Sequence, residues 1–180
     1  MNIWNLILKC FGWSVQINVP YRDKAVICVA PHTSNWDFII GLLAYRSKGR
    51  KASFLMKKFW FFFPLKYILK GLGGIPVNTE TSQSLTSTLV KDFKNSKQLN
   101  LAVTPEGSRS AVSKWKTGFL TIAYNANVII QLGIIDFKNK KVIIEKEFTP
   151  TGNNLTDLSF IRKYYSDFKE AALYPDKFIA

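Results

Sequence analysis

The sequence predicts one α/β domain with a mixed central sheet flanked by helices. Short segments rich in β-branched residues alternate with longer segments whose apolar residues recur at helical spacing. That alternation is the pattern of α/β proteins. The length of 180 residues suits one domain with a substantial core. Apolar residues make up 47% of the chain, which is ordinary for a globular protein.

Residues 1–17 predict an amphipathic helix that carries two tryptophans. Its apolar residues at helical spacing are Ile3, Trp4, Ile7, Leu8, Phe11 and Val15. Tryptophan favours the membrane–water interface, so we expect residues 1–18 to form an interfacial helix, followed by one domain over residues 19–180. The same pattern also fits a first helix that packs on the core. The segment is too polar for a confident membrane span and lacks the pattern of a signal peptide.

The first strand and helix of the predicted domain flank a polar turn. Residues 25–30 are short, apolar and rich in β-branched side chains, as in a buried strand, and Pro31 ends the run. Residues 33–35 are Thr-Ser-Asn, which are good helix N-caps, and an apolar helical pattern follows over about 35–47.

The remaining elements continue the alternation. Strands are expected over residues 52–56, after the Gly73-Gly74 turn, and over 99–103, 128–134 and 141–147, the last of them edge-like. Helices are expected over about 81–98, 118–126 and 156–172, the first facing solvent and the last on the surface.

A run of aromatic residues separates two of these strands. Lys57 and Lys58 precede the aromatic residues 59–63, which Pro64 and then Lys66 interrupt. The run cannot cross a bilayer alone. Aromatic rings interleaved with lysines suit the headgroup boundary, where the lysine stems lie in the apolar layer and the ammonium groups stay hydrated. The alternative is a core segment whose lysines are exposed.

The charge of the chain is strongly basic and unevenly distributed. The formal net charge is +13, and residues 1–130 hold 17 Lys and Arg against 5 Asp and Glu, whereas residues 131–180 hold 8 against 7. A one-sided basic surface favours nucleic acid, anionic lipid or a phosphorylated ligand. Nucleic acid is disfavoured, because the aromatics cluster with aliphatics and no nucleic-acid signature is present. Cys10 and Cys28 match no metal or redox spacing, which fits a reducing, cytoplasmic setting.

His32 is the only histidine, and Asp37 follows it five residues later. Strand-to-helix turns in α/β folds face ligand crevices, and imidazole suits proton transfer near neutral pH. A nearby carboxylate can fix the tautomer of the ring and stabilise the imidazolium. Since no obvious nucleophile lies beside the pair, we expect the base to act on a hydroxyl or amine of the substrate. The alternative is a capping or packing role for His32.

A second polar turn follows the strand predicted over residues 99–103. It reads Thr-Pro-Glu-Gly-Ser-Arg-Ser over residues 104–110. Arg109 offers a bidentate fork for a phosphate or carboxylate, and Glu106 could hold it in place or form a structural salt bridge. Backbone N–H groups at the Gly107 turn, or at the helix start after His32, could meet a developing oxyanion.

The two turns, about 70 residues apart and each after an apolar strand, resemble the glycerolipid acyltransferases, the family of 1-acylglycerol-3-phosphate acyltransferases. The resemblance covers about residues 20–135. It implies a membrane-associated enzyme on the cytoplasmic face of the inner membrane, peripheral or monotopic. It also implies transfer of a fatty acyl group from acyl-CoA or acyl carrier protein, with an anionic membrane surface as partner and no metal or further cofactor.

The resemblance also assigns roles to individual residues. It implies that His32 is the general base and that Asp37 orients it. The substrate-binding residues that it implies are Glu106, Gly107, Ser108, Arg109, Lys57, Lys58 and Asn78. The chain departs from the family pattern where Asn78 precedes a threonine in place of an arginine. The acceptor therefore stays open between a 1-acylglycerol 3-phosphate and another lysolipid, such as a lyso-aminolipid. A non-catalytic lipid-binding protein of the same fold is the alternative function.

Overall fold

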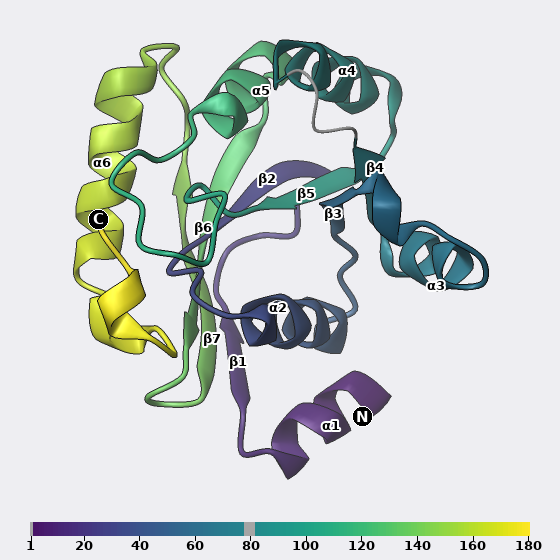
Figure 1. Ribbon diagram of the computed structural model, residues 1–180, viewed down its shortest axis with the longest axis vertical. Coiled ribbons are helices and arrows are strands. Elements are labelled where there is room, and N and C mark those ends of the chain that lie inside the picture. Colours follow the sequence, from purple (N-terminus) through teal and green to yellow (C-terminus); the bar gives the residue numbers. More distant parts are fainter. Residues whose placement is uncertain (1, 78–81) are drawn as a thin grey trace.

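A mixed sheet organises the protein, whose computed structural model describes residues 2–77 and 82–180. Within these residues the sheet has seven strands in the order β1-β7-β6-β2-β5-β3-β4 (Figure 1). The strands are β1 (Ser14–Ile17), β2 (Lys24–Val29), β3 (Ser53–Lys57), β4 (Gly74–Val77), β5 (Leu99–Val103), β6 (Ile129–Asp136) and β7 (Lys141–Phe148). The α/β class predicted from the sequence is confirmed.

The central strands run parallel. β2 pairs in parallel with β5 on one side and with β6 on the other, and β3 and β4 continue the parallel order beyond β5. β7 runs antiparallel to β6, and β1 pairs in parallel with β7. Cys28 of β2 lies opposite Val103 of β5, so the loops that leave these two strands start side by side.

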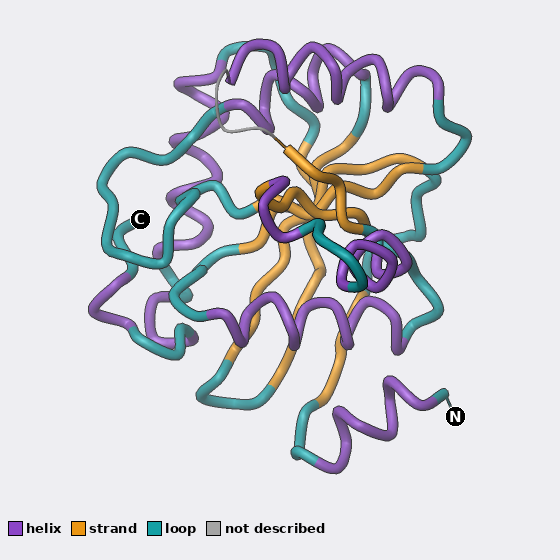
Figure 2. Tube along the Cα trace, turned by 45° about the vertical axis from the view of Figure 1, so that its right-hand side comes forward, coloured by secondary structure: helices purple, strands orange, loops and turns teal. Residues whose placement is uncertain are grey.

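Helices cover both faces of the sheet. The helices are α1 (Ile3–Cys10), α2 (Asn35–Ser47), α3 (Leu65–Leu72), α4 (Ser82–Asn95), α5 (Gly118–Ala126) and α6 (Asn154–Ser166). Three short 3₁₀ turns, η1 (Lys58–Trp60), η2 (Lys169–Ala171) and η3 (Pro175–Lys177), complete the described elements. α4, α5 and α6 lie on one face, whereas α2 lies on the other with α1 beside it (Figure 2).

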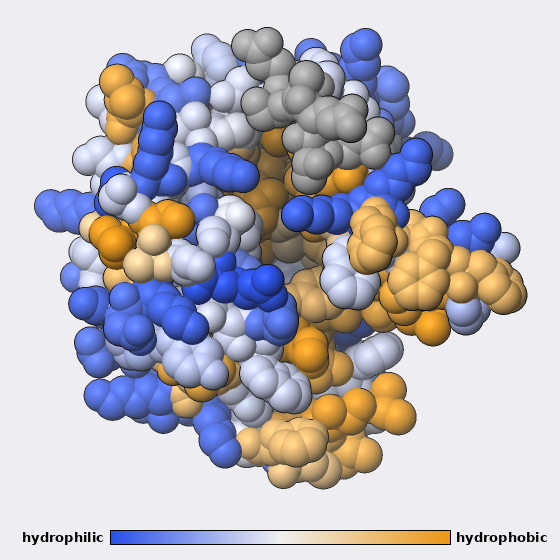
Figure 3. All heavy atoms as spheres, viewed as in Figure 1, coloured by the Kyte–Doolittle hydropathy of each residue, from blue (hydrophilic) through white to orange (hydrophobic). Residues whose placement is uncertain are grey.

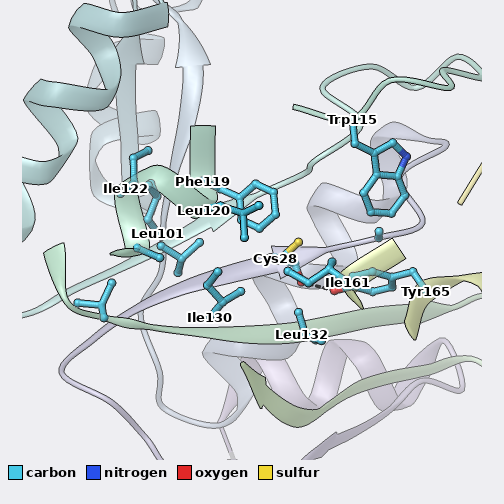
Figure 4. Packing of buried hydrophobic residues seen from close by; sticks show 14 of the residues in the cluster. Cys28, Leu101, Trp115, Phe119, Leu120, Ile122, Ile130, Leu132, Ile161 and Tyr165 are labelled. Atoms are coloured by element: carbon cyan, nitrogen blue, oxygen red, sulfur yellow. Dashed lines mark hydrogen bonds between the residues drawn. The ribbon is translucent and has the colours of Figure 1, made fainter. Parts of the chain in front are cut away.

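The main core lies between the sheet and the α4–α6 face. Val26 and Cys28 of β2 and Leu132 of β6 are fully buried there against α5 and α6 (Figure 4). The run of apolar residues in β2 and β6 reflects burial on both faces, which is the expected pattern for parallel strands between two helix layers. A smaller cluster packs Leu8 of α1 and Ala44 of α2 against the opposite face.

The N-terminal helix is shorter than predicted. Instead of one helix over residues 1–17, α1 ends at Cys10, Gly12 adopts a left-handed φ of 77°, and residues 14–17 form β1. The side chains of β1 alternate between exposed and half-buried, a period of two that favours a strand. Because β1 pairs with the outer side of β7, the prediction that residues 141–147 form an edge strand is wrong.

Two helices that were expected at the surface bury one face. Leu89 and Phe93 of α4, and Ile161 and Tyr165 of α6, lie in the main core. Their spacing of four residues places each pair on one side of its helix. The prediction that α4 faces only solvent is therefore wrong, because a few apolar residues suffice to dock a polar helix. α6 also ends at Ser166, earlier than predicted.

Candidate active site

The two polar turns meet at the carboxyl ends of β2 and β5. One turn, residues 30–37, leads from β2 into α2, and the other, residues 104–117, leads from β5 towards α5. The backbone N–H of His32 donates a hydrogen bond to Oε1 of Glu106 at 2.9 Å. This bond joins the two turns directly, although they lie 74 residues apart in the chain.

Local folding at the start of α2 fixes Asp37. The backbone N–H groups of Thr33 and Ser34 each donate to Oδ2 of Asp37 at 2.8 Å. Ser34 is the N-cap of α2, and its Oγ accepts from the N–H of Trp36 at 3.1 Å. This reciprocal arrangement is a capping box, in which a helix start satisfies its own orphan donors. The Asp37 side chain is buried and held in a single orientation.

His32 lies against this fixed carboxylate. Its Nδ1 is 3.1 Å from Oδ2 of Asp37. Nδ1 makes no aligned hydrogen bond to this oxygen, and the contact becomes an ion pair only when the ring is protonated. Nε2 of His32 makes no hydrogen bond with any described residue, and the ring lines a cleft. This nitrogen is therefore free to accept a proton from a ligand.

Glu106 and Arg109 do not pair as the sequence suggested. Among the described residues, Arg109 Nη1 instead donates to Oδ1 of Asn35, in the first turn of α2. Glu106 is buried, and its Oε2 has no partner among the described residues. Burial raises the pKa of Glu106 to about 7, and the hydrogen bond from the His32 backbone lowers it in part. Glu106 therefore holds the His32 backbone, whereas Asn35 holds the guanidinium.

The turn between these two residues needs a glycine. Gly107 has a left-handed φ of 63°, which other residues rarely adopt. A Cβ at this position would lie 2.7 Å from Cε of Lys116, whose stem crosses the turn. Ser108 Oγ accepts from the N–H of Ser110 at 3.2 Å, which closes the turn locally.

A cleft of about 750 Å³ opens between α2 and the sheet. His32, Asp37, Asn35, Arg109 and Thr104 form its polar part. Its walls are mostly apolar and include Ile27, Val29, Phe38, Gly41, Leu42, Phe54, Leu69, Ala102, Gly133, Ile135 and Ile144, with Tyr45 among them. The surface is hollowed near the middle of the face in Figure 3, where apolar side chains lie between basic ones. The volume is in the range of pockets that enclose small organic ligands.

The other predicted binding residues lie outside the cleft wall or outside the described residues. Lys57 ends β3 at the same edge of the sheet as the two turns, and Lys58 begins η1; both are exposed. Gly107 and Ser108 belong to the second turn but do not line the cleft. Asn78 lies outside the described residues. No group of His, Cys, Asp and Glu side chains within residues 2–77 and 82–180 has the arrangement of a metal site.

Sequence reasoning missed the face of α2 that forms the cleft. Phe38, Leu42 and Tyr45 recur at intervals of three and four residues and face the sheet across the cleft. The sequence shows this spacing, which predicts a helix but does not tell which side of the helix lines a cleft. The sequence likewise indicates a capping role for Asn35 and gives no local signal that it is the partner of Arg109.

A family model described as Acyltransferase matches residues 14–134, which is more than half of the chain. The matched segment runs from β1 into β6 and contains both polar turns. A search of curated proteins finds no match.

The burial of Glu106 predicts a pH dependence of stability. Because its pKa is about 7 in the folded protein against an ordinary value of 4.5, the folded state holds this proton more tightly than the unfolded chain. The free energy of unfolding should therefore fall as the pH rises from about 4.5 to about 7, by up to about 3 kcal/mol.

Glu106→Gln cannot ionise, so the decrease should be absent from its urea unfolding curves measured across this pH range. Glu145→Gln, at an exposed carboxylate of β7, is the matched control and should follow the wild type. If the free energy of unfolding changed with pH in the same way for Glu106→Gln and the wild type, burial would not raise the pKa of Glu106.

Proposed function

The chain belongs to the acyltransferase family, and we propose that it moves a fatty acyl group from a thioester to the hydroxyl or amine of a single-chain lipid. The observation that carries the proposal is the position of His32. Its imidazole sits beside a fixed carboxylate, at the polar part of an otherwise apolar cleft. An acyl chain fits the apolar part, and an acceptor can meet the base at the polar part.

The chemistry follows from these groups. A thioester is already activated, so the enzyme needs to align the acceptor and remove one proton. The acceptor oxygen or nitrogen attacks the thioester carbonyl carbon while Nε2 of His32 takes its proton. Asp37 stabilises the resulting imidazolium, and the C–S bond breaks to release the thiolate, which the proton can neutralise. General base catalysis contributes about 10²–10⁴-fold, and alignment of two substrates contributes up to about 7–11 kcal/mol.

Arg109 supports a lipid acceptor with an anionic group. Its guanidinium lies at the polar part of the cleft and is held by Asn35 from α2. A guanidinium binds phosphate or carboxylate through two parallel hydrogen bonds. A 1-acylglycerol 3-phosphate or another anionic lysolipid therefore fits, with acyl-CoA or acyl carrier protein as donor. Such a reaction would belong to phospholipid biosynthesis.

The test of the proposal is His32→Ala. Removing the base should lower kcat for acyl transfer by about 10²–10⁴-fold, because the acceptor would have to lose its proton to water. The measurement is thiol release from acyl-CoA, or from acyl carrier protein, with a panel of lysolipids as acceptors.

Circular dichroism and vesicle binding of His32→Ala should match the wild type, which separates loss of catalysis from loss of fold. Near-normal turnover in the variant would show that His32 is not the base. Lysolipid binding without turnover by the wild-type protein on every acceptor would favour a non-catalytic lipid-binding role.

The acyl chain should occupy the part of the cleft beside Gly41. A Cβ at this helical position would lie 3.4 Å from Cδ1 of Ile135, so Gly41→Leu should fill part of the cleft. Each methylene excluded from burial costs about 0.8 kcal/mol, or about fourfold in kcat/KM. Competition between acyl-CoA donors of different lengths should therefore show a shift towards shorter chains.

Gly71→Leu provides the matched control. Gly71 is also helical, has open space at its Cβ position and does not line the cleft. Its substitution should leave the preference for chain length unchanged. An unchanged preference in Gly41→Leu would place the acyl chain elsewhere.

We also propose that the protein binds an anionic membrane surface peripherally, at the cytoplasmic face. η1, α3 and their connection expose six large apolar side chains, Phe59, Trp60, Phe62, Phe63, Tyr67 and Ile68. Ile3, Leu6 and Phe11 are exposed around α1. Both groups form apolar areas on the face shown in Figure 3, with basic residues near them. No described helix combines the length and the apolar character needed to span a bilayer.

The aromatic segment is connected to the cleft. Trp60 of η1 and Leu65 and Leu69 of α3 line it, so the same segment supplies exposed rings outside and one wall of the cleft inside. Contiguous exposed apolar side chains beside lysines favour an interfacial location. This arrangement would let a lysolipid pass from the membrane into the cleft without crossing water.

Replacing two of the exposed rings tests membrane binding. Phe59 and Phe63 are 80% and 76% exposed, so Phe59→Ser with Phe63→Ser should leave the fold intact. The double variant should sediment at least tenfold less with vesicles that contain phosphatidylglycerol, because two rings no longer enter the apolar layer.

Leu155→Ser is the control, since Leu155 is also 80% exposed but begins α6, away from α3 (Figure 1). Equal loss of binding in this control, or no loss in the double variant, would contradict a specific role of the aromatic segment.

A further inference from the structure

We propose that residues 171–179, here the C-terminal segment, form a positioning element that connects both turns of the active site. The segment lies beyond residues 14–134, which match the family model. It makes a hydrogen bond to the turn that carries His32 and another to the loop that carries Glu106 and Arg109. The proposal deepens the proposed function, because it assigns residues that set the geometry of that same site.

The first connection reaches the residue next to the base. The backbone N–H of Tyr174 donates to Oγ1 of Thr33 at 3.3 Å. Thr33 is buried, and its own N–H donates to Oδ2 of Asp37 at 2.8 Å. The C-terminal segment thus contacts Thr33, which follows His32 in the chain and donates a hydrogen bond to Asp37.

The second connection holds the loop of Glu106 and Arg109. The indole N–H of Trp115 donates to the backbone oxygen of Ile179 at 2.9 Å, and its ring packs against Phe178 with ring centroids 5.8 Å apart. Both rings are buried. The next residue, Lys116, donates its backbone N–H to the oxygen of Pro105 at 2.7 Å. A shift of Trp115 would therefore be passed to the residue that precedes Glu106.

The segment is itself anchored to the sheet. The oxygen of Ala171 accepts from the N–H of Phe137, just after β6, at 2.8 Å. Ahead of the segment, the hydroxyl of Tyr165 in α6 donates to the oxygen of Cys28 in β2 at 2.6 Å. The ring of Tyr165 lies 6.0 Å from that of Trp115, and Figure 4 shows the two together. The C-terminal segment can thus transmit the position of the sheet to both turns.

The expected consequence concerns alignment rather than acyl-chain binding. The two turns also contact each other directly, through the His32–Glu106 hydrogen bond and the hydrogen bond from Arg109 to Asn35. Displacement of a reacting group by about 1 Å can cost about 100-fold in rate. No residue of the C-terminal segment lines the cleft. Loss of a hydrogen bond between the segment and either turn should therefore lower kcat and leave the KM for the acyl donor unchanged.

A double-mutant cycle of Thr33→Val and Trp115→Phe tests the proposal. Thr33→Val removes the acceptor of the Tyr174 N–H at nearly constant shape, and Trp115→Phe removes the donor to Ile179. Each should lower kcat by about 3- to 10-fold, as expected for one lost hydrogen bond. If one segment connects the two turns, the double variant should lose little more than the worse single variant, because distant independent sites are additive.

Matched controls remove similar groups elsewhere. Thr121→Val removes a side-chain hydrogen bond from Asn154 between α5 and α6, and Trp13→Phe shortens a buried ring in the smaller cluster. Neither should change kcat by more than about twofold, and their effects should multiply. Multiplying effects for Thr33→Val and Trp115→Phe, or an increase in donor KM alone, would overturn the positioning role.

Hydrogen exchange separates this proposal from the proposed function. In Thr33→Val, amide exchange measured by mass spectrometry should rise at least threefold over residues 106–116, although the substitution lies in the other turn. Thr121→Val should leave these residues at the wild-type level. If the wild type transfers no acyl group, the proposed function fails. Hydrogen exchange still tests whether the C-terminal segment connects the two turns. Exchange at the wild-type level over residues 106–116 in Thr33→Val would overturn the proposed connection between the turns.

Discussion

The active-site arrangement depends on the parallel pairing of β2 with β5. The two strands are about 70 residues apart in the chain, yet Cys28 lies opposite Val103 and both strands point the same way. The chain after β2 continues into α2 on one face of the sheet, and the chain after β5 continues to α5 on the other. Such divergence at the carboxyl ends of neighbouring strands creates a crevice. The bond between the His32 backbone and Glu106 joins the two loops that leave these strands.

The local parts of this site follow from the sequence, whereas its long-range contacts do not. A β-branched run ended by a proline predicts β2, and the Thr-Ser-Asn cap predicts the start of α2 almost to the residue, because caps and strands depend on near neighbours. The capping box that fixes Asp37 also lies within four residues. By contrast, the choice of Asn35 rather than Glu106 as the partner of Arg109 joins segments far apart in the chain, and no local signal encodes it. The placement of residues 14–17 beside β7 has the same cause.

Two functions of one helix explain the shape of the cleft. The first turn of α2 supplies Asn35 and Asp37 to the polar part, and its later turns supply Phe38, Leu42 and Tyr45 to the apolar part. A ligand that lies along α2 therefore meets charged groups at one end and hydrocarbon at the other. The polarity of the helix matches this use, since its positive end lies beside the carboxylate of Asp37. The transfer of a fatty acyl group proposed above would use this division, because a fatty acyl thioester combines a reactive carbonyl with an apolar chain.

The outermost strands carry a consequence for solubility. β1 and β4 each have four residues, and Pro76 within β4 has no N–H to donate. Long unpaired strands invite other chains to extend a sheet, and short strands or prolines at the border discourage this. The membrane binding proposed above would bring copies of the protein to high local concentrations in similar orientations. Sheet edges that accept few additional strands would allow many copies to lie close together there without forming a continuous intermolecular β-sheet.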